Sequence, residues 1–192
     1  MSVAYVFDLD DTLMSTRALF SHPRNNMILS RAEALSKHRP PQQKEPIYQN
    51  AYSHIVPPDR RLRWMLQQLA GPKYLFTNGT RMHARCAIRS LEIQDLFDGQ
   101  LDRNGTLGAL KPDPTVFMTM HKAVSNHCRG CRRIVFVDDL LANVQQGKRF
   151  GWQTVWINPL VSKMKYMPPG VDYGFPNIYV ALEYLGGSYH AF

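Results

Sequence analysis

Two pairs of acidic residues in this chain each come at the end of an apolar run. Asp8 and Asp10 end the first such run, and Asp138 and Asp139 end another more than a hundred residues later. Buried carboxylates are costly unless a cation or hydrogen bonds compensate them. Carboxylates that meet at one sheet edge need a hard divalent cation, and Mg²⁺ suits ligands that are all oxygen. The alternative is two unrelated turns, in which Asp is common.

A second group of residues is suited to binding an anion. Thr77, Asn78 and Gly79 follow a third apolar run and precede a helical pattern. A hydroxyl, an amide and free N–H groups at a helix start form a cradle for oxyanions, although Thr or Asn there could equally be a simple cap. Lys111 lies in the stiff segment KPDP, where its charge could neutralise a phosphoryl group. Taken alone, it would be a solvated surface lysine.

The elements that must position these residues alternate along the chain. Short apolar, β-branched or aromatic runs predict strands over Ser2–Phe7, Lys73–Phe76, Arg133–Val137 and Gln153–Ile157. Apolar residues at helical spacing predict helices over Asp59–Leu69, Thr80–Leu91, Pro114–Val124, Leu140–Phe150 and Ile178–Leu185. The alternation predicts an α/β fold with a Rossmann-like, three-layer parallel sheet. The polar segments would lie at the carboxyl ends of its strands, where such sheets bind ligands.

A polar, basic stretch from about Met14 to Val56 interrupts this alternation. It predicts a helix over Asn26–Lys37 and continues into HRPPQQKEP, which is rich in proline and charge. Long structureless loops inside compact domains are uncommon unless they are functional. We therefore expect a core of residues 1–13 plus 57–192, with residues 14–56 forming a small, basic, inserted helical cap.

The segments DLDDT, TNG, Lys111 and DD occur in this order on successive elements. They resemble motifs I to IV of the haloacid dehalogenase (HAD) superfamily, and the resemblance covers nearly the whole chain outside the insert. Within the superfamily, FTNGTRMHARCAIRSLEIQDLFDG, KPDP and FVDDLLAN resemble the pyrimidine 5′-nucleotidase group. The insert departs from that group, which usually carries a larger helical cap.

The resemblance implies a Mg²⁺-dependent phosphomonoester hydrolase. Asp8 would be the nucleophile that forms an aspartyl-phosphate, and Asp10 would be the general acid and then the general base. Thr12 would support the turn that holds Asp10. Mg²⁺ would be held by the Asp8 carboxylate, the Asp10 backbone carbonyl and Asp139, with Asp138 assisting directly or through water.

The resemblance also implies a phosphate site. Thr77 and Lys111 would bind the phosphoryl oxygens, with Asn78 and Gly79 lining the same cradle. His83 resembles a histidine on the corresponding helix of the nucleotidase group. Its position leaves two interpretations open, a place near the substrate or a structural role.

The expected substrate is a small phosphorylated metabolite, with a nucleoside monophosphate favoured. The chain has 23 Lys and Arg against 15 Asp and Glu, a net charge of +8. This charge either favours acidic partners, nucleic acid among them, or only aids solubility. DLDDT and DD also resemble the carboxy-terminal-domain phosphatases, so phosphorylated nucleic-acid ends or phosphoproteins are an alternative. A second alternative is a binding protein that keeps the fold without turnover.

Weaker signals concern the insert and the cysteines. Basic and aromatic side chains of the insert would contact a nucleotide, or else form a solvated face and core packing: Arg17, Arg24, Arg31, Lys37, Arg39, Tyr48 and Tyr52. One CxxC with nearby histidines is a weak zinc signal: His121, His127, Cys128 and Cys131. Three cysteines and no apolar run of membrane-spanning length predict a cytoplasmic protein in a reducing compartment. The oligomeric state is left open.

Overall fold

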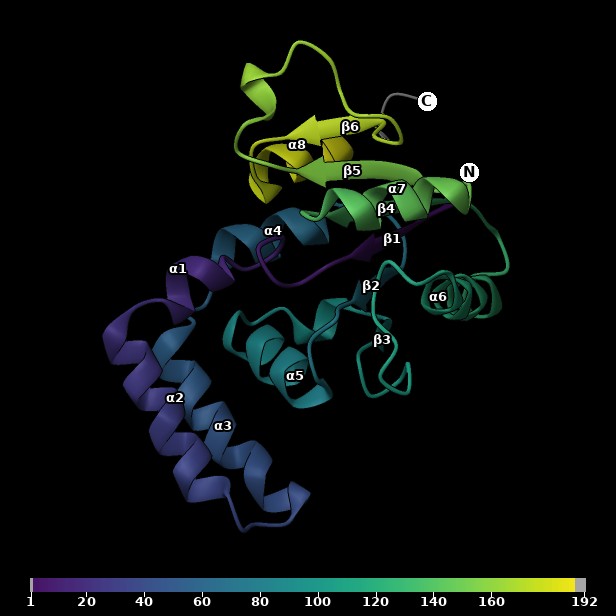
Figure 1. Ribbon diagram of the computed structural model, residues 1–192. Helices are drawn as coiled ribbons and strands as arrows, with labels where there is room; N and C mark the ends of the chain where they lie inside the picture. Colours follow the sequence, from purple (N-terminus) through teal and green to yellow (C-terminus); the bar gives the residue numbers. More distant parts are fainter. Residues whose placement is uncertain (1, 189–192) are drawn as a thin grey trace.

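The computed structural model describes residues 2–188, which form a six-stranded sheet flanked by helices (Figure 1). The strand order is β3-β2-β1-β4-β5-β6, and every neighbouring pair is parallel. The strands are β1 (Ser2–Phe7), β2 (Lys73–Phe76), β3 (Gly99–Leu101), β4 (Cys131–Asp138), β5 (Gln153–Ile157) and β6 (Tyr173–Phe175). The Rossmann-like α/β fold is thereby confirmed.

Helices connect these strands. They are α1 (Thr16–Phe20), α2 (Pro23–Ser36), α3 (Pro41–Ile55), α4 (Arg60–Gln67), α5 (Arg81–Ser90), α6 (Pro114–His127), α7 (Leu141–Arg149) and α8 (Ile178–Ser188), with 3-10 turns η1 (Gln94–Leu96) and η2 (Val161–Lys163). All four predicted strands and all five predicted core helices are present within a few residues of their expected bounds. Strands β3 and β6 were not predicted, because three residues at a sheet edge show no periodicity.

The sheet separates two apolar layers. Along β1, Val3, Tyr5 and Phe7 contribute to the layer formed with α4, α5 and α8, whereas Ala4 and Val6 contribute to the layer formed with α6. Side chains alternate between the faces of a strand, so a strand that is apolar throughout is buried on both faces. Burial of β1 on both sides fixes its carboxyl end, and therefore Asp8, at the centre of the sheet edge.

The insert is helical. Helices α2 and α3 form a hairpin that extends away from the sheet, with α5 lying between the hairpin and β2 (Figure 1). The expected helix over Asn26–Lys37 is the greater part of α2. In the proline-rich segment after it, residues 38–40 form the turn of the hairpin and residues 41–46 begin α3. Pro41 takes the first helical position, where its missing N–H costs nothing. Among the described residues, no helix has the length and apolarity to span a bilayer.

Candidate active site

Asp8 and Lys111 form a buried ion pair at the carboxyl end of β1. Lys111 Nζ lies 2.7 Å from Asp8 Oδ1, 2.7 Å from Asp138 Oδ2 and 2.6 Å from the carbonyl oxygen of Phe76. The three hydrogens of the ammonium group are thus matched by three acceptors. Burial alone would lower the pKa of Lys111, but the carboxylates of Asp138 and Asp8 outweigh it and raise that pKa. Lys111 is therefore a fixed positive charge that also orients Asp8.

Three carboxylates meet around this lysine. Side-chain oxygens of Asp8, Asp138 and Asp139 all lie within 4.8 Å of one another. Burial raises the pKa of Asp8 to about 8, with Lys111 opposing the shift and Asp138 adding to it. Burial and the charge of Asp138 raise the pKa of Asp139 to about 6. When all three carboxylates are ionised, they and the single ammonium leave two negative charges, which is the charge that one divalent cation would balance.

Asp138 and Asp139 differ in their surroundings. Asp138 is fully buried, and its Oδ1 accepts hydrogen bonds from the backbone N–H of Leu140 at 2.9 Å and from Asn143 Nδ2 at 3.0 Å. Its Oδ2 is held by Lys111. The carboxylate of Asp139 is half-buried and is approached by the Thr12 hydroxyl at the longer distance of 3.5 Å. Asp139 therefore has more capacity to bind a cation directly.

Asp10 is held apart from this cluster. Its Oδ1 accepts from the Thr16 hydroxyl at 2.9 Å and lies 2.7 Å from His83 Nε2, while its Oδ2 lies 3.5 Å from Thr77 Oγ1. Burial alone would raise the pKa of Asp10, but the hydrogen bond and charge of His83 outweigh it, so that pKa is lowered. The left-handed φ of 57° at Asp11 turns the chain at this point, which Asp tolerates.

The anion cradle is only partly directed at the site. Thr77 Oγ1 accepts from the backbone N–H of Gly79 at 2.9 Å and lies at the end of β2, next to Asp10. The amide of Asn78 instead bonds the backbone of Lys111, accepting at 2.7 Å and donating at 3.1 Å. Asn78 thus positions Lys111, and its amide oxygen and one amide hydrogen are used in doing so.

A cleft opens beside Asp139. It has a volume of about 440 Å³, within the range of small-molecule sites. Asp139 and Thr12 line one part of it, and Asn158, Asn177 and Tyr179 line another. The insert contributes to this cleft through its first residues and not through the α2–α3 hairpin. The cleft thus gives the acidic cluster a polar, accessible neighbour.

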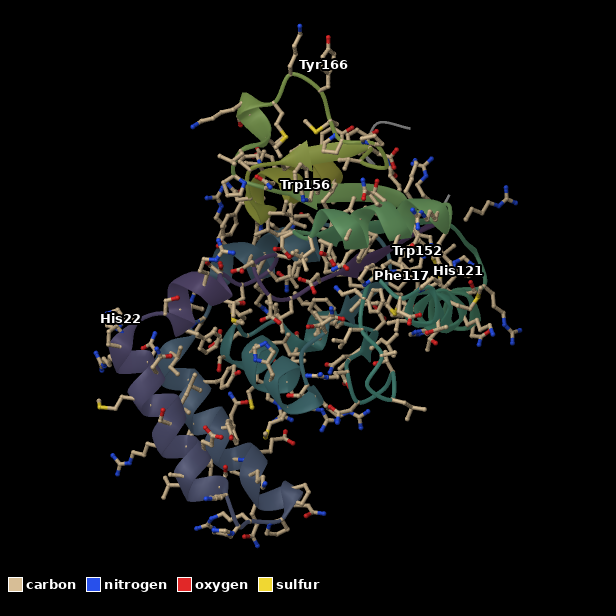
Figure 2. All side chains as sticks on the ribbon, in the orientation of Figure 1. His22, Phe117, His121, Trp152, Trp156 and Tyr166 are labelled. Atoms are coloured by element: carbon tan, nitrogen blue, oxygen red, sulfur yellow. A yellow bond between two sulfur atoms is a disulfide. The ribbon has the colours of Figure 1, made fainter. Side chains whose placement is uncertain are left out.

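The suggested zinc ligands do not form a metal site in the described part of the chain. Cys128 and Cys131 are joined by a disulfide, which the count of three cysteines did not lead us to expect. His121 accepts a hydrogen bond from Trp152 Nε1 at 3.0 Å and stacks on its ring near Phe117, while His127 packs against Tyr74 (Figure 2). Within residues 2–188, the one group of acids, histidines or cysteines close enough to hold a metal is Asp8, Asp138 and Asp139.

Sequence reasoning missed several contacts in the site. Thr16 and Asn143 were not singled out, and His83 and Tyr52 were noted without a partner. The signal for His83 was its place three residues after Thr80, whose hydroxyl accepts from the His83 N–H at 3.3 Å and caps α5. A residue in the first turn of α5 lies at the sheet edge, beside the end of β2.

No family model matches the sequence. Solved structures do resemble the fold. A putative β-phosphoglucomutase from Thermotoga maritima has a TM-score of 0.65 and 15% identity, covering 100% of both chains. L-2-haloacid dehalogenase from Xanthobacter autotrophicus has a TM-score of 0.63 and 17% identity, covering 97% of this chain and 99% of that one. A HAD phosphatase from Thermococcus onnurineus has a TM-score of 0.59 and 20% identity, covering 97% and 99%. The fold is therefore HAD-like, and its structural neighbours are members of that superfamily.

Proposed function

We propose that this chain is a Mg²⁺-dependent phosphomonoester hydrolase that works through an aspartyl-phosphate on Asp8, with nucleoside monophosphates as substrates. The observation that carries the proposal is the convergence of Asp8, Asp138 and Asp139 around the buried ammonium of Lys111. With all three carboxylates ionised, that cluster is short of positive charge by the amount that one divalent cation supplies. The HAD-like fold and its phosphatase neighbour support the same class of reaction.

The first step transfers the phosphoryl group to the enzyme. Lys111 engages Oδ1 of Asp8, which leaves Oδ2 to attack phosphorus. As the new P–O bond forms, the bond from phosphorus to the ester oxygen breaks, and Asp10 gives its proton to that oxygen. The Thr77 hydroxyl and the Lys111 charge stabilise the phosphoryl oxygens during transfer.

The second step releases phosphate. Asp10, now ionised, takes a proton from water, and the water oxygen attacks the phosphorus of the aspartyl-phosphate. The bond between phosphorus and the Asp8 oxygen breaks, which regenerates the carboxylate. Asp10 thus serves as acid and then as base, and its separation from the buried pair around Lys111 suits it to that exchange.

The donor set fits magnesium. The ligands we assign are the Asp8 carboxylate, the Asp10 backbone carbonyl and the Asp139 carboxylate, all of them oxygen donors. Asp138 would support the site without being a main ligand, since its oxygens are already held by Lys111, Leu140 and Asn143. When bound, Mg²⁺ would neutralise the charge of the acidic cluster and of the transferring phosphoryl group.

Displacement of a halide from carbon, the reaction class named for some structural neighbours, fits these residues less well. A halide leaves without needing a proton, whereas an ester oxygen needs one, and Asp10 is held in a fixed position beside the acidic cluster by Thr16 and His83. Displacement of a halide from carbon also does not require three carboxylates arranged to bind a cation. The acidic cluster and Asp10 together favour phosphoryl transfer.

The cleft beside Asp139 supports a small-molecule substrate. Its volume of about 440 Å³ suits the organic part of a phosphate ester, and Asn158 and Asn177 bring amide groups to it. Tyr179 adds an aromatic ring. A nucleoside matches this mixture of amide and aromatic surfaces. The alternatives of phosphorylated nucleic-acid ends or phosphoproteins would make less use of a bounded cleft.

A hydrolysis panel tests the proposal. Phosphate release is measured for nucleoside monophosphates, sugar phosphates, a 3′-phosphorylated oligonucleotide and a phosphoprotein, and chloride release for 2-chloropropionate. We expect turnover of nucleoside monophosphates that EDTA removes and Mg²⁺ restores, and that Asp8→Asn abolishes without a change in the circular dichroism spectrum. Preferred turnover of the oligonucleotide or phosphoprotein would reassign the substrate. Chloride release, or no turnover of any ester with Mg²⁺, would contradict the function.

A further inference from the structure

A chain of hydrogen bonds links Asp10 to the insert. His83 Nε2 lies 2.7 Å from Asp10 Oδ1, and the other ring nitrogen, Nδ1, lies 2.5 Å from the hydroxyl of Tyr52. Asp10 follows β1, His83 belongs to α5 of the core, and Tyr52 belongs to α3 of the insert. Because a carboxylate oxygen can only accept, Nε2 carries the hydrogen in this contact. The imidazole is thereby held from both sides.

These hydrogen bonds determine which oxygen of Asp10 is free to face the substrate. Oδ1 accepts from both Thr16 and His83, so its lone pairs are engaged. Oδ2 points towards Thr77 Oγ1, at the weaker distance of 3.5 Å. A proton delivered to a leaving group must therefore be carried on Oδ2. Loss of the His83 contact would let the carboxyl group rotate and exchange its two oxygens.

The imidazole fits its place closely. A Cβ at Gly79 would lie 2.6 Å from His83 Cδ2, so the absence of a side chain at that position admits the ring. The rings of Phe20 and Tyr52 lie 6.3 and 5.7 Å from the imidazole centroid. Both residues belong to the insert, so aromatic groups from α1 and α3 enclose a histidine of the core.

Side-chain hydrogen bonds fix the position of α3 of the insert against α5. Arg89 Nη1 donates to Glu45 Oε1 at 2.6 Å, and Gln49 Nε2 donates to the Ser90 hydroxyl at 3.2 Å. Tyr52 is one or two helical turns further along α3 and is buried, with 6% of its surface exposed. The packing of α3 on α5 that attaches the hairpin to the core therefore also places the Tyr52 hydroxyl next to His83.

We propose that His83 is a positioning residue for the general acid Asp10, and that Tyr52 of the insert completes the site by holding His83. The inference rests on the proposed function, since it assumes that Asp10 protonates a leaving group. It assigns the insert a part in catalysis that does not require contact with the substrate. It also distinguishes Tyr52 from Tyr48, whose hydroxyl accepts from Ser36 within the insert at 3.5 Å.

The test compares two leaving groups. 4-Nitrophenyl phosphate departs readily without a proton, whereas an alkyl phosphate needs one. The alkyl ester is the monoester that the wild-type protein hydrolyses fastest in the panel above. The quantity is kcat/KM, which covers only the steps up to formation of the aspartyl-phosphate. The variants are His83→Ala, His83→Gln and Tyr52→Phe, with Tyr48→Phe as the matched control.

For His83→Ala we expect kcat/KM to fall on the order of 100-fold with the alkyl ester, the lower end of what general acid catalysis supplies, and much less with 4-nitrophenyl phosphate. His83→Gln, which keeps a donor, should recover part of the loss. Tyr52→Phe should lower the ratio of kcat/KM for the alkyl ester to kcat/KM for 4-nitrophenyl phosphate by a smaller factor. Tyr48→Phe should leave this ratio unchanged.

Equal losses on both substrates in His83→Ala and His83→Gln would overturn the inference and leave the proposed function standing, since His83 would then be structural. If Tyr52→Phe leaves the ratio of the two kcat/KM values unchanged, the insert has no part in positioning Asp10. Circular dichroism of each variant identifies a failure to fold, in which case the His83→Gln and Tyr52→Phe ratios decide. A wild-type protein inactive on every ester would overturn both the function and this inference.

Discussion

The side chain of Asn78 binds both backbone polar groups of Lys111. Asn78 Oδ1 accepts from the Lys111 N–H at 2.7 Å, and Asn78 Nδ2 donates to the Lys111 carbonyl at 3.1 Å. The two residues come from different loops, one after β2 and one before α6. This pairing holds the lysine backbone so that its ammonium can reach Asp8 and Asp138.

Replacing Asn78 should therefore damage the site without touching its charges. Asn78→Ala leaves the N–H and carbonyl of Lys111 without their partners, which costs roughly 1–3 kcal/mol when such groups are shielded from water. We expect a lower melting temperature and a lower kcat. Asn78→Asp keeps the acceptor and loses the donor, and should lie between Asn78→Ala and the wild type. An Asn78→Ala protein with wild-type kcat would contradict the role.

Asp138 and Asp139 should respond in opposite ways to loss of charge when no metal is present. Asp138→Asn removes one of the two carboxylates that hold the buried ammonium of Lys111, while Asp8 remains as the other, so the loss should be about 1.5–3 kcal/mol, as for a hydrogen bond to a charged group. Asp139 has its pKa raised to about 6, so its ionised form opposes folding at pH 7. Asp139→Asn should therefore keep or increase the free energy of unfolding in EDTA. Urea denaturation of both variants in EDTA measures the difference, and a large destabilisation by Asp139→Asn would contradict it.

Magnesium should stabilise the folded protein. A ligand that binds only the native state adds about 2.7 kcal/mol at a concentration 100 times its dissociation constant. We expect the melting temperature to rise with Mg²⁺ concentration in the wild type and not in Asp139→Asn. A monovalent salt at equal ionic strength is the control. Equal shifts in both proteins would mean that Asp139 is not a ligand.

Gly79 provides a test of the space beside His83. An added methyl group in Gly79→Ala would lie 2.6 Å from His83 Cδ2 and must displace the ring. We expect kcat/KM for an alkyl phosphate to fall while the circular dichroism spectrum is preserved. Gly187→Ala in α8 is the matched control, because a Cβ there meets nothing within 4 Å. Wild-type kcat/KM in Gly79→Ala would show that the ring has room to move.

The central strands and the meeting of the motifs were predictable for a physical reason. A run such as Ser2–Phe7 is apolar on both faces, which a buried parallel strand requires, and its bounds in the structure are those predicted. Carboxyl ends of parallel strands share one edge, so the proximity of Asp8 to Asp138 and Asp139 follows from the topology.

The contacts with the insert were not predictable in the same way. The Tyr52–His83 pair depends on the angle at which α3 packs on α5, and no local pattern encodes that angle. Only the first helix of the hairpin was predicted. Pro41 and Pro46 suggested a break in the chain, whereas α3 begins at Pro41 and continues through Pro46. Asn78 was assigned to the anion cradle because its residue type suits one, whereas its partner, Lys111, lies 33 residues away in the sequence.

The central claim is that Asp8 is the nucleophile, and trapping the phosphorylated enzyme tests it most directly. The wild-type protein is mixed with a hydrolysed ester and Mg²⁺, quenched in acid within one turnover, and analysed by peptide mass spectrometry. The account predicts one added phosphoryl group on the peptide that contains Asp8, absent from Asp8→Asn and from samples quenched after EDTA treatment. A phosphoryl group on a different residue, or turnover that persists in Asp8→Asn, would contradict it.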